Sequence, residues 1–313
     1  MTYTLLFLLL FILILTHASE AAAYAAEGFL LWYSKMIPSL LPFMILSGLM
    51  IRMGLSHRLG KWLQPVLKPL LRCRSEVNYG VIMGFLCGFP MGARVAAQLY
   101  RDGKINRQEA RFLLAFCNNI GPVYLCSFVL PLLGRKMIWP YIVGMYGIPL
   151  LYGMVLRRTM FRELPQPPSS SKKLRRTTVF DPPAENVSAG LLTHLDDAVQ
   201  SGLQGILSLC GYMILFNLLN LAPHLLLPGG VDSMLSPLLE ITGGLHRLGQ
   251  SYPLYSLLLL PFGGLSCIAQ TYSMIHDTDL PLGEYVIHKL LLTALTTIYY
   301  LAWKCLFPHH FLL

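Results

Sequence analysis

Long apolar runs, separated by short polar stretches, constrain the fold of this chain more than any other feature. Each run approaches the ~20 residues that an α-helix needs to cross a bilayer. Of the 313 residues, 55% are apolar and only 12% are charged, which is too little charge to cover a soluble domain of this size. We therefore predict an all-α, polytopic membrane protein. The runs are Met36 to Leu55, Tyr79 to Tyr100, Phe112 to Leu133, Met137 to Leu156, Gly202 to Leu221, Tyr255 to Ile275 and Val286 to Phe307.

The N-terminal segment, residues 1–27, is ambiguous. Its apolar run from Leu5 to Leu15 is short for a span, and the alanine-rich stretch from Ala18 to Ala26 resembles a signal-peptide cleavage region. No lysine or arginine precedes the run, which favours an uncleaved first helix that extends through the alanines.

The distribution of charge predicts topology rather than nucleic-acid binding. Although the net charge is +9, the basic residues lie between apolar runs and form no basic stripe interleaved with aromatic residues. The stretches Arg52 to Arg74, Arg101 to Arg111 and Arg157 to Arg176 hold 17 of the 24 lysines and arginines. By the positive-inside rule, these three face the cytoplasm. The loops Asp232 to Arg247 and His276 to Glu284 are poor in basic residues, so we expect them outside.

A soluble linker divides the chain into two halves. Residues 158–190 contain a proline-rich motif, a serine triplet and a basic cluster, a composition typical of a flexible connection. Residues 28–157 and 191–313 are the two candidate repeats. Following the spans through the membrane gives these halves opposite orientations.

Each half contains a segment that glycine interrupts near its midpoint. Tyr79 to Tyr100 is predicted to enter from the cytoplasm and return, and Tyr255 to Ile275 to do the same from outside. Inverted repeats with paired broken helices place a substrate site at the bilayer midplane. We therefore predict two inverted repeats, each with a broken re-entrant helical hairpin. At a fixed offset of 175 residues, Gly88, Asp102 and Glu109 fall on Gly263, Asp277 and Glu284.

The first break suggests an anion site. Gly88, Pro90 and Gly92 can stop one helix and start another, whose free amides would point into the membrane interior and favour a carboxylate. Arg94 adds a planar, permanently charged fork. In the alternative interpretation, Arg94 snorkels to the cytoplasmic face or pairs with Glu109, and the glycines only permit close helix packing.

Two further breaks carry polar side chains. Asn118 and Asn119 precede a Gly-Pro pair, where a helix cannot continue undisturbed, and their amides could line a cavity. Alternatively, they form interhelical hydrogen bonds worth about 0.6 kcal/mol each. The candidate residues of the break in the second half are Gly263, Gly264, Ser266 and Gln270.

Two glutamates have a functional and a plain interpretation. Glu240 is a candidate for coupling to protons or sodium if it lies near a cavity, or a solvated residue of an interfacial amphipathic helix. Glu109 follows Asn106 at the spacing of a capping box.

The chain lacks the motifs of a cofactor-dependent or ATP-driven protein. It contains no phosphate-binding loop and no zinc or Ser/His/Asp grouping, so we predict no enzyme, no cofactor and no metal, and gradients as the energy source. The seven cysteines form no C-x-x-C pair and are expected to be free, packed thiols.

At these motifs the sequence resembles the sporulation integral membrane protein family YlbJ, also called SpoVV, within the wider group that carries a nucleoside-recognition Gate domain. The Phe at 89 and the Cys at 117 depart from the tyrosine and serine common there, which puts hydrogen bonding at both positions in doubt. The resemblance is carried by Pro38 to Phe43, Gly88 to Ala93, Glu109-Ala110, Asn118 to Pro122, Glu240 to Gly243 and Gly263 through Gln270.

This resemblance implies a role in moving dipicolinate, a small aromatic dicarboxylate, across the outer forespore membrane of an endospore-forming bacterium. A transporter of a small organic anion is thus the first hypothesis, with the lipid bilayer, a coupling ion and further copies of the chain as other partners. A nucleoside transporter and a non-transporting membrane scaffold for spore envelope assembly are the alternatives.

Overall fold

The computed structural model describes residues 2–134, 138–165 and 187–308, and in these ranges the chain is helical and forms no strand. The prediction of an all-α, multi-pass membrane protein is confirmed. Five helical segments are long and apolar enough to cross a membrane, and each overlaps a predicted run. They are Ala18–Arg52, Ile138–Arg158, Gly190–Leu226, Pro253–Ile275 and Leu282–Leu306.

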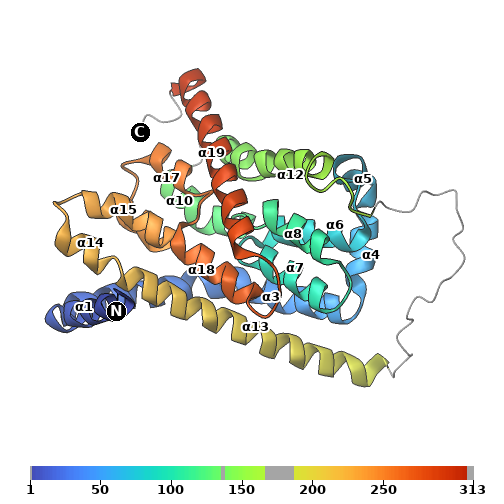
Figure 1. Cartoon of the computed structure of the whole chain (residues 1–313), viewed down its shortest axis with the longest axis horizontal. Helices are drawn as coiled ribbons and strands as arrows, with labels where there is room; N and C mark the ends of the chain where they lie inside the picture. Colours follow the sequence, from blue (N-terminus) through green and yellow to red (C-terminus); the bar gives the residue numbers. More distant parts are fainter. Residues whose placement is uncertain (1, 135–137, 166–186, 309–313) are drawn as a thin grey trace, which may run out of the picture.

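The helices of the two halves pack against one another (Figure 1). In the first half they are α1 (Thr2–Thr16), α2 (Ala18–Leu31), α3 (Ile37–Arg52), α4 (Leu55–Trp62), α5 (Gln64–Leu71), α6 (Ser75–Cys87), α7 (Met91–Arg101), α8 (Arg107–Phe116), α9 (Pro122–Tyr124), α10 (Leu130–Leu133), α11 (Ile138–Ile142) and α12 (Ile148–Arg158). In the second half they are α13 (Val187–Leu218), α14 (Leu221–Leu226), α15 (Val231–Leu239), α16 (Ile241–Leu248), α17 (Pro253–Leu259), α18 (Gly264–Ile275) and α19 (Leu282–Leu306).

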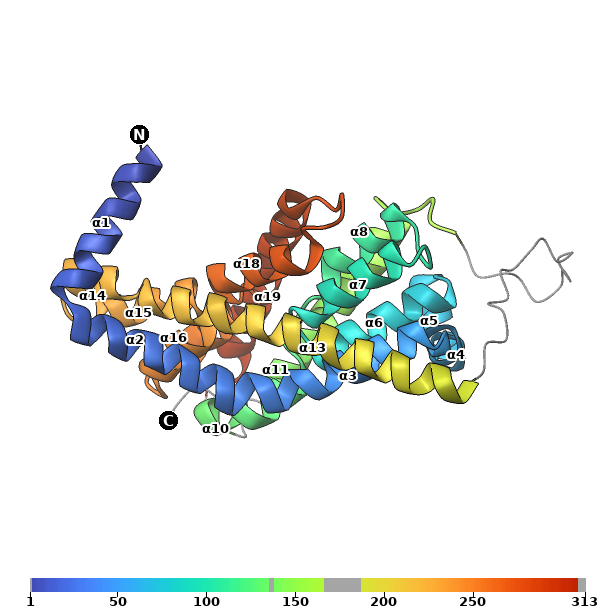
Figure 2. The ribbon, with the colours of Figure 1, turned by 90° about the horizontal axis from the view of Figure 1, so that it is seen from below.

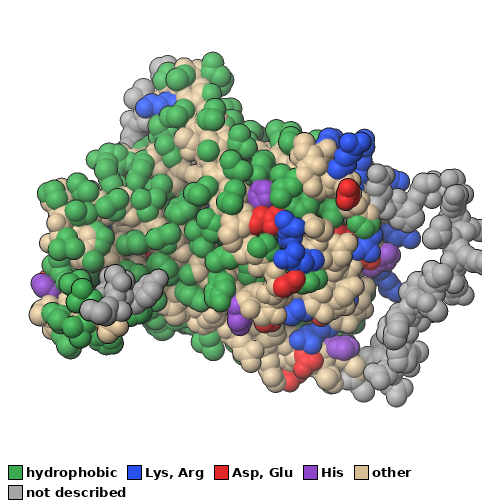
Figure 3. All heavy atoms as spheres, in the orientation of Figure 1, with side chains coloured by type: hydrophobic (Ala, Val, Ile, Leu, Met, Phe, Trp, Pro, Cys, Tyr) green, Lys and Arg blue, Asp and Glu red, His purple; other side chains and the backbone are tan. Residues whose placement is uncertain are grey.

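The outer surface has the pattern expected of a protein in lipid. In Figure 3, hydrophobic side chains cover most of the visible face, and charged side chains gather at the end that carries α4, α5 and the turn between α7 and α8. Because lipid favours apolar side chains and charge belongs near water, this distribution places the charged end at a membrane surface.

The long helix α13 joins the two halves. It lies along α2 and α3 over most of their length (Figure 2), and the Trp32 indole donates to the carbonyl of Ile206 at 2.8 Å. The predicted linker after Arg157 falls largely on residues 166–186, outside the described residues.

The predicted topology of the second half is wrong at one loop. The turn from α18 to α19 lies beside the turn from α7 to α8 (Figures 1 and 2), whereas the sequence placed these loops on opposite faces. The positive-inside rule counts lysine and arginine and takes little account of acids, so it misplaced a loop whose acids pair with bases from elsewhere. The ion pairs are Arg101 with Asp277 (2.5 Å), Arg107 with Asp279 (2.7 Å) and Arg111 with Glu284 (2.6 Å).

The two hairpins are also not the predicted pair. In the first half, α6 and α7 pack against each other as arms separated by the break at Gly88, as expected. In the second half the packed arms are α15 and α16, which join at Glu240. The chain of α17 and α18 is broken at Gly263 but runs on as one candidate span, Pro253–Ile275. A glycine break permits a reversal of direction but does not require one, which is why the prediction failed here.

Candidate functional site

Three helix breaks from distant parts of the sequence meet inside the helical bundle. The first lies between α6 and α7, the second between α8 and α9, and the third at Glu240 between α15 and α16. The backbone N–H of Phe89 donates to the carbonyl of Asn119 at 2.6 Å, which joins the first two breaks. Backbone groups that the breaks leave without helical partners are thus satisfied within the protein, as a membrane interior requires.

Glycine makes this close approach feasible. Gly88 has a φ of 81°, which a residue with a side chain rarely adopts. A Cβ atom at Gly88 would collide with the backbone nitrogen of Gly121, and one at Gly121 would lie 2.8 Å from the carbonyl carbon of Cys87. The two breaks therefore touch backbone to backbone.

A small cavity with apolar walls and a few polar groups lies where the breaks converge. Its volume is about 30 Å³, enough for roughly one or two water molecules. The first break contributes Phe89, the second Tyr124, and the third Glu240 and Thr242, while α18 contributes Gln270. The Tyr124 hydroxyl donates to that of Thr242 at 3.2 Å, so the second and third breaks also touch.

Glu240 is buried in this wall, with 2% of its surface exposed. Its carboxylate accepts hydrogen bonds from the backbone N–H groups of Thr242 (3.1 Å) and Gly243 (2.6 Å) and thereby caps α16, whose N-terminal dipole favours a negative charge. The interpretation of Glu240 as a solvated residue on an interfacial helix is therefore wrong.

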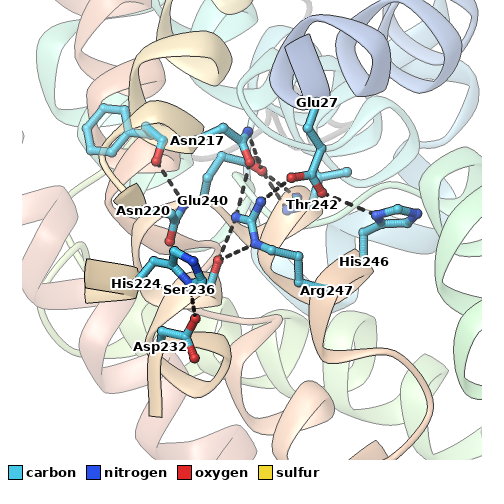
Figure 4. Close-up of polar contacts among 12 residues, drawn as sticks. Glu27, Asn217, Asn220, His224, Asp232, Ser236, Glu240, Thr242, His246 and Arg247 are labelled. Carbon is cyan, nitrogen blue, oxygen red and sulfur yellow. Dashed lines mark hydrogen bonds and ion pairs between the residues drawn. The ribbon is translucent and has the colours of Figure 1, made fainter. Parts of the chain in front are cut away.

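A polar network connects Glu240 to a second acid (Figure 4). The amide of Asn217 donates to the Glu240 carboxylate at 3.3 Å, and its oxygen accepts from Arg247 at 3.3 Å. Arg247 also forms an ion pair with Glu27 of α2 and donates to the Ser236 hydroxyl at 2.6 Å. The charge at the cavity is thus held by donors from α13 and α16.

Arg94 is buried, with 6% of its surface exposed, but it does not line this cavity. Its Nη2 donates to the Ser201 hydroxyl of α13 at 2.8 Å. The suggested pairing of Arg94 with Glu109 is wrong, because Glu109 binds Arg74 through two hydrogen bonds. The predicted capping box between Asn106 and Glu109 is present.

The anion receptor predicted at the start of α7 is absent from the described structure. The N–H of Gly92 donates to the carbonyl of Gly88, that of Arg94 to Pro90, and that of Ala93 to the Asn118 side chain at 3.4 Å. The chain satisfies these amides itself because the break folds back on α8.

The Asn118 side chain forms hydrogen bonds to other helices, whereas the Asn119 side chain bonds within its own segment. The Asn118 amide donates to the hydroxyls of Thr271 (2.9 Å) and Tyr285 (3.1 Å), and the Asn119 amide donates to the carbonyl of Phe116 at 2.6 Å. Neither side chain lines the cavity, and the alternative of interhelical hydrogen bonds describes Asn118.

The candidate residues of the second half lie around the cavity. A Cβ atom at Gly263 would lie 3.6 Å from the ring of Phe89, and one at Gly264 would lie 3.1 Å from the carbonyl of Leu239, beside the third break. Gln270 lines the cavity and donates to the Ser266 hydroxyl at 2.8 Å.

Sequence reasoning missed Lys289, a buried cation of α19. Only 3% of its surface is exposed, its Nζ donates to the carbonyl of Asn118 at 2.8 Å, and it lies 5.5 Å from the centre of the Phe89 ring. No carboxylate of the described residues lies within ion-pair distance of it. A single lysine inside an apolar run was the available signal, since charge at that depth is costly and commonly functional.

Fold and site together define a class: a multi-pass, all-helical membrane protein whose broken helices converge on an internal cavity that contains a buried carboxylate. The chain belongs to the Gate family, described as nucleoside recognition, whose model matches residues 33–215. It is also similar to the sporulation integral membrane protein YlbJ of Bacillus subtilis (strain 168), with 27% identity over 338 aligned positions that cover 96% of this chain and 82% of that protein. No solved structure matches this chain.

Proposed function

We propose that this protein transports a small organic anion across a membrane, with dipicolinate as the first candidate and spore formation as the context. The convergence of three helix breaks on one internal cavity carries the proposal, because broken helices at membrane depth characterise the substrate sites of secondary transporters. Similarity to a sporulation membrane protein supports the context.

Lys289 supports an anionic substrate. Its charge lies beside Phe89, a wall residue of the cavity, and no described carboxylate neutralises it. An aromatic carboxylate could stack on the ring of Phe89 or Tyr124 while its charge meets the ammonium group. Arg94 does not line this cavity.

Transport requires that the cavity enlarge. Its volume of about 30 Å³ leaves no room for a six-membered ring, so the structure corresponds to a closed state of the proposed cycle. We place the movement in the hairpins α6/α7 and α15/α16. Both halves have the same order of elements: α6/α7 precedes the broken helix α8/α9, and α15/α16 precedes the broken helix α17/α18. This shared order replaces the offset of 175 residues as the basis of the proposed inverted repeat.

The test is binding and flux with purified, reconstituted protein. Labelled dipicolinate should bind and exchange across proteoliposomes. Lys289→Met should reduce binding at least about tenfold, the equivalent of 1.4 kcal/mol, while Lys304→Met, an exposed lysine of the same helix, should leave it unchanged. Equal binding by both variants would remove Lys289 from the site.

Glu240 is the proposed coupling residue, since a carboxylate in a membrane cavity can carry a proton or hold a cation. Glu240→Gln keeps one of the two acceptor oxygens for the α16 amides, replaces the other with a donor, and removes the charge. We expect exchange of substrate between equilibrated compartments to persist and accumulation against a gradient to stop. If the variant loses both exchange and accumulation and unfolds at a lower temperature, Glu240 serves only as the cap of α16.

A nucleoside substrate is favoured by one separate observation. Glu240 is the charged residue among the described cavity-lining residues, and Thr242 and Gln270 accompany it, a set suited to the hydroxyl groups of a neutral sugar. Competition by uridine and not by dipicolinate would establish this alternative. Binding of neither compound, together with no flux, would favour the membrane scaffold.

A further inference from the structure

A second cavity opens at the charged end of the molecule, between α7, α13 and α18. Its volume is about 260 Å³, far larger than that of the internal cavity. Arg94 lies in its wall with the hydroxyl-bearing Ser201, Ser208 and Ser273. We call this cavity the vestibule.

Arg94 presents an uncompensated charge to the vestibule. Its Nη1 is buried and has no hydrogen-bond partner among the described residues, and no described carboxylate pairs with the guanidinium. Gly205 makes room for it, because a Cβ atom there would lie 2.5 Å from Nη1. An arginine buried in this way needs an acceptor that the described protein does not supply.

The other charged groups of the vestibule do not supply that acceptor. Both carboxylate oxygens of Asp277 accept hydrogen bonds from Nη1 of Arg101, at 2.5 and 2.6 Å. His276 is exposed, and its ring contacts the carbonyl of Ser273 at 2.9 Å. Arg52, a further charge that acts on Arg94, forms its own ion pair with Asp197 at 3.2 Å. The local field therefore favours an anion.

The vestibule lies on the line toward the internal cavity. Along α13, Ser208 of the vestibule is about 7.5 Å from Met213 of the internal cavity, and along α18, Ser273 is about 4.5 Å from Gln270, at 1.5 Å per residue. Buried Leu209 of α13 and buried Thr271 of α18 lie within these two intervals. The two cavities are thus roughly one helical turn apart along both helices.

We propose that the vestibule is a docking site for a small oxyanion, a carboxylate or a phosphate, bound by Arg94 before it reaches the internal cavity. The location on a transport path rests on the function proposed above, but the anion site does not. A soluble metabolite and a lipid headgroup offer the same chemistry, and the test separates them.

The test uses Ser208→Cys as a reporter of local charge. Cys126, Cys210 and Cys305 are replaced by serine because they are exposed or half-buried. Cys73, Cys87, Cys117 and Cys267 are buried and stay. In nanodiscs of zwitterionic lipid, we measure reaction rates with methanethiosulfonates that carry a sulfonate, a trimethylammonium or no charge.

Normalised to the neutral reagent, the sulfonate should react faster than the trimethylammonium compound. Arg94→Gln should lower this preference at least about tenfold, and Arg94→Lys should retain most of it. Normalisation to the neutral reagent separates a charge effect from a collapsed vestibule. Equal preference with and without the Arg94 charge overturns the proposal.

Protection identifies the source of the anion. Slower labelling of the reporter with added dipicolinate or inorganic phosphate indicates a soluble ligand, and slower labelling in phosphatidylglycerol discs indicates a headgroup. An Arg94-dependent preference without any dipicolinate flux would support the vestibule and refute the proposed function. Full dipicolinate flux in Arg94→Gln, with an unchanged reagent preference at the reporter cysteine, would support the proposed function and refute the anion site in the vestibule.

Discussion

Buried charged side chains in this protein fall into two groups. Glu109 is held by Arg74 and by the capping box, and Glu240 by the amides of α16. Lys289 and Arg94, by contrast, have polar contacts but no described counter-charge. Because an unpaired charge away from water is costly, the second group marks the places where a ligand would contribute most.

Arg157 also lacks a described counter-charge, but four backbone carbonyls accept hydrogen bonds from it, and it has a structural role. It donates to the carbonyls of Phe161 (2.8 Å), Arg162 (2.9 Å), Leu164 (2.9 Å) and Arg72 (3.1 Å), and so ties the end of α12 to the loop before α6. We expect Arg157→Met to lower the free energy of unfolding by about 2–4 kcal/mol, because several buried acceptors lose their donor.

Thermal unfolding in detergent measures this effect. Arg162→Met is the matched control, since the Arg162 side chain is exposed and only its carbonyl accepts from Arg157. Equal unfolding temperatures for the two variants would contradict the structural role.

At the scale of elements, the contact between the first two breaks depends on glycine. Gly88→Ala adds a Cβ at a positive φ and against the backbone of Gly121. We expect it to destabilise the protein by more than about 1 kcal/mol and to reduce flux, because the strain and the collision act on the same hairpin.

Gly211→Ala is the matched control. Gly211 lies within α13, and a Cβ there meets nothing within 4 Å, so alanine should stabilise the helix by up to about 1 kcal/mol. Unfolding temperature and dipicolinate exchange are measured for both. A harmless Gly88→Ala would show that the breaks do not need to touch.

At the scale of the whole molecule, the turn from α18 to α19 and the turn from α7 to α8 lie together and belong on the same side of the membrane. Cysteines placed in the exposed loops as Asp102→Cys and Asp279→Cys should both react with an impermeant thiol reagent from the cytoplasmic side. Ser251→Cys, in the turn between α16 and α17 at the opposite end (Figure 2), should react only from the other side. If Asp279→Cys instead reacts from the same side as Ser251→Cys, the external position that the sequence predicted for the turn from α18 to α19 is correct.

The ion pairs also show why charge counting failed. Arg101 and Asp277 are about 38% and 46% exposed, and such a pair contributes only about 0–1 kcal/mol. The loops are brought together mainly by packing of α18 on α7 and of α19 on α8. Packing between distant helices leaves no trace in the net charge of a loop.

The sequence by itself determined the class of protein and the positions of three breaks, though not of the break at Glu240, because apolar length, glycine and proline act locally on the chain. Gly88, the Asn118–Pro122 segment and Gly263 all interrupt helices as predicted. Only the tertiary structure decided what the breaks surround. It brought Glu240 and Phe89 into one wall, placed Lys289 beside it, and moved Arg94 to another cavity. Those placements depend on which helix faces pack together, a property of pairs of segments far apart in the chain.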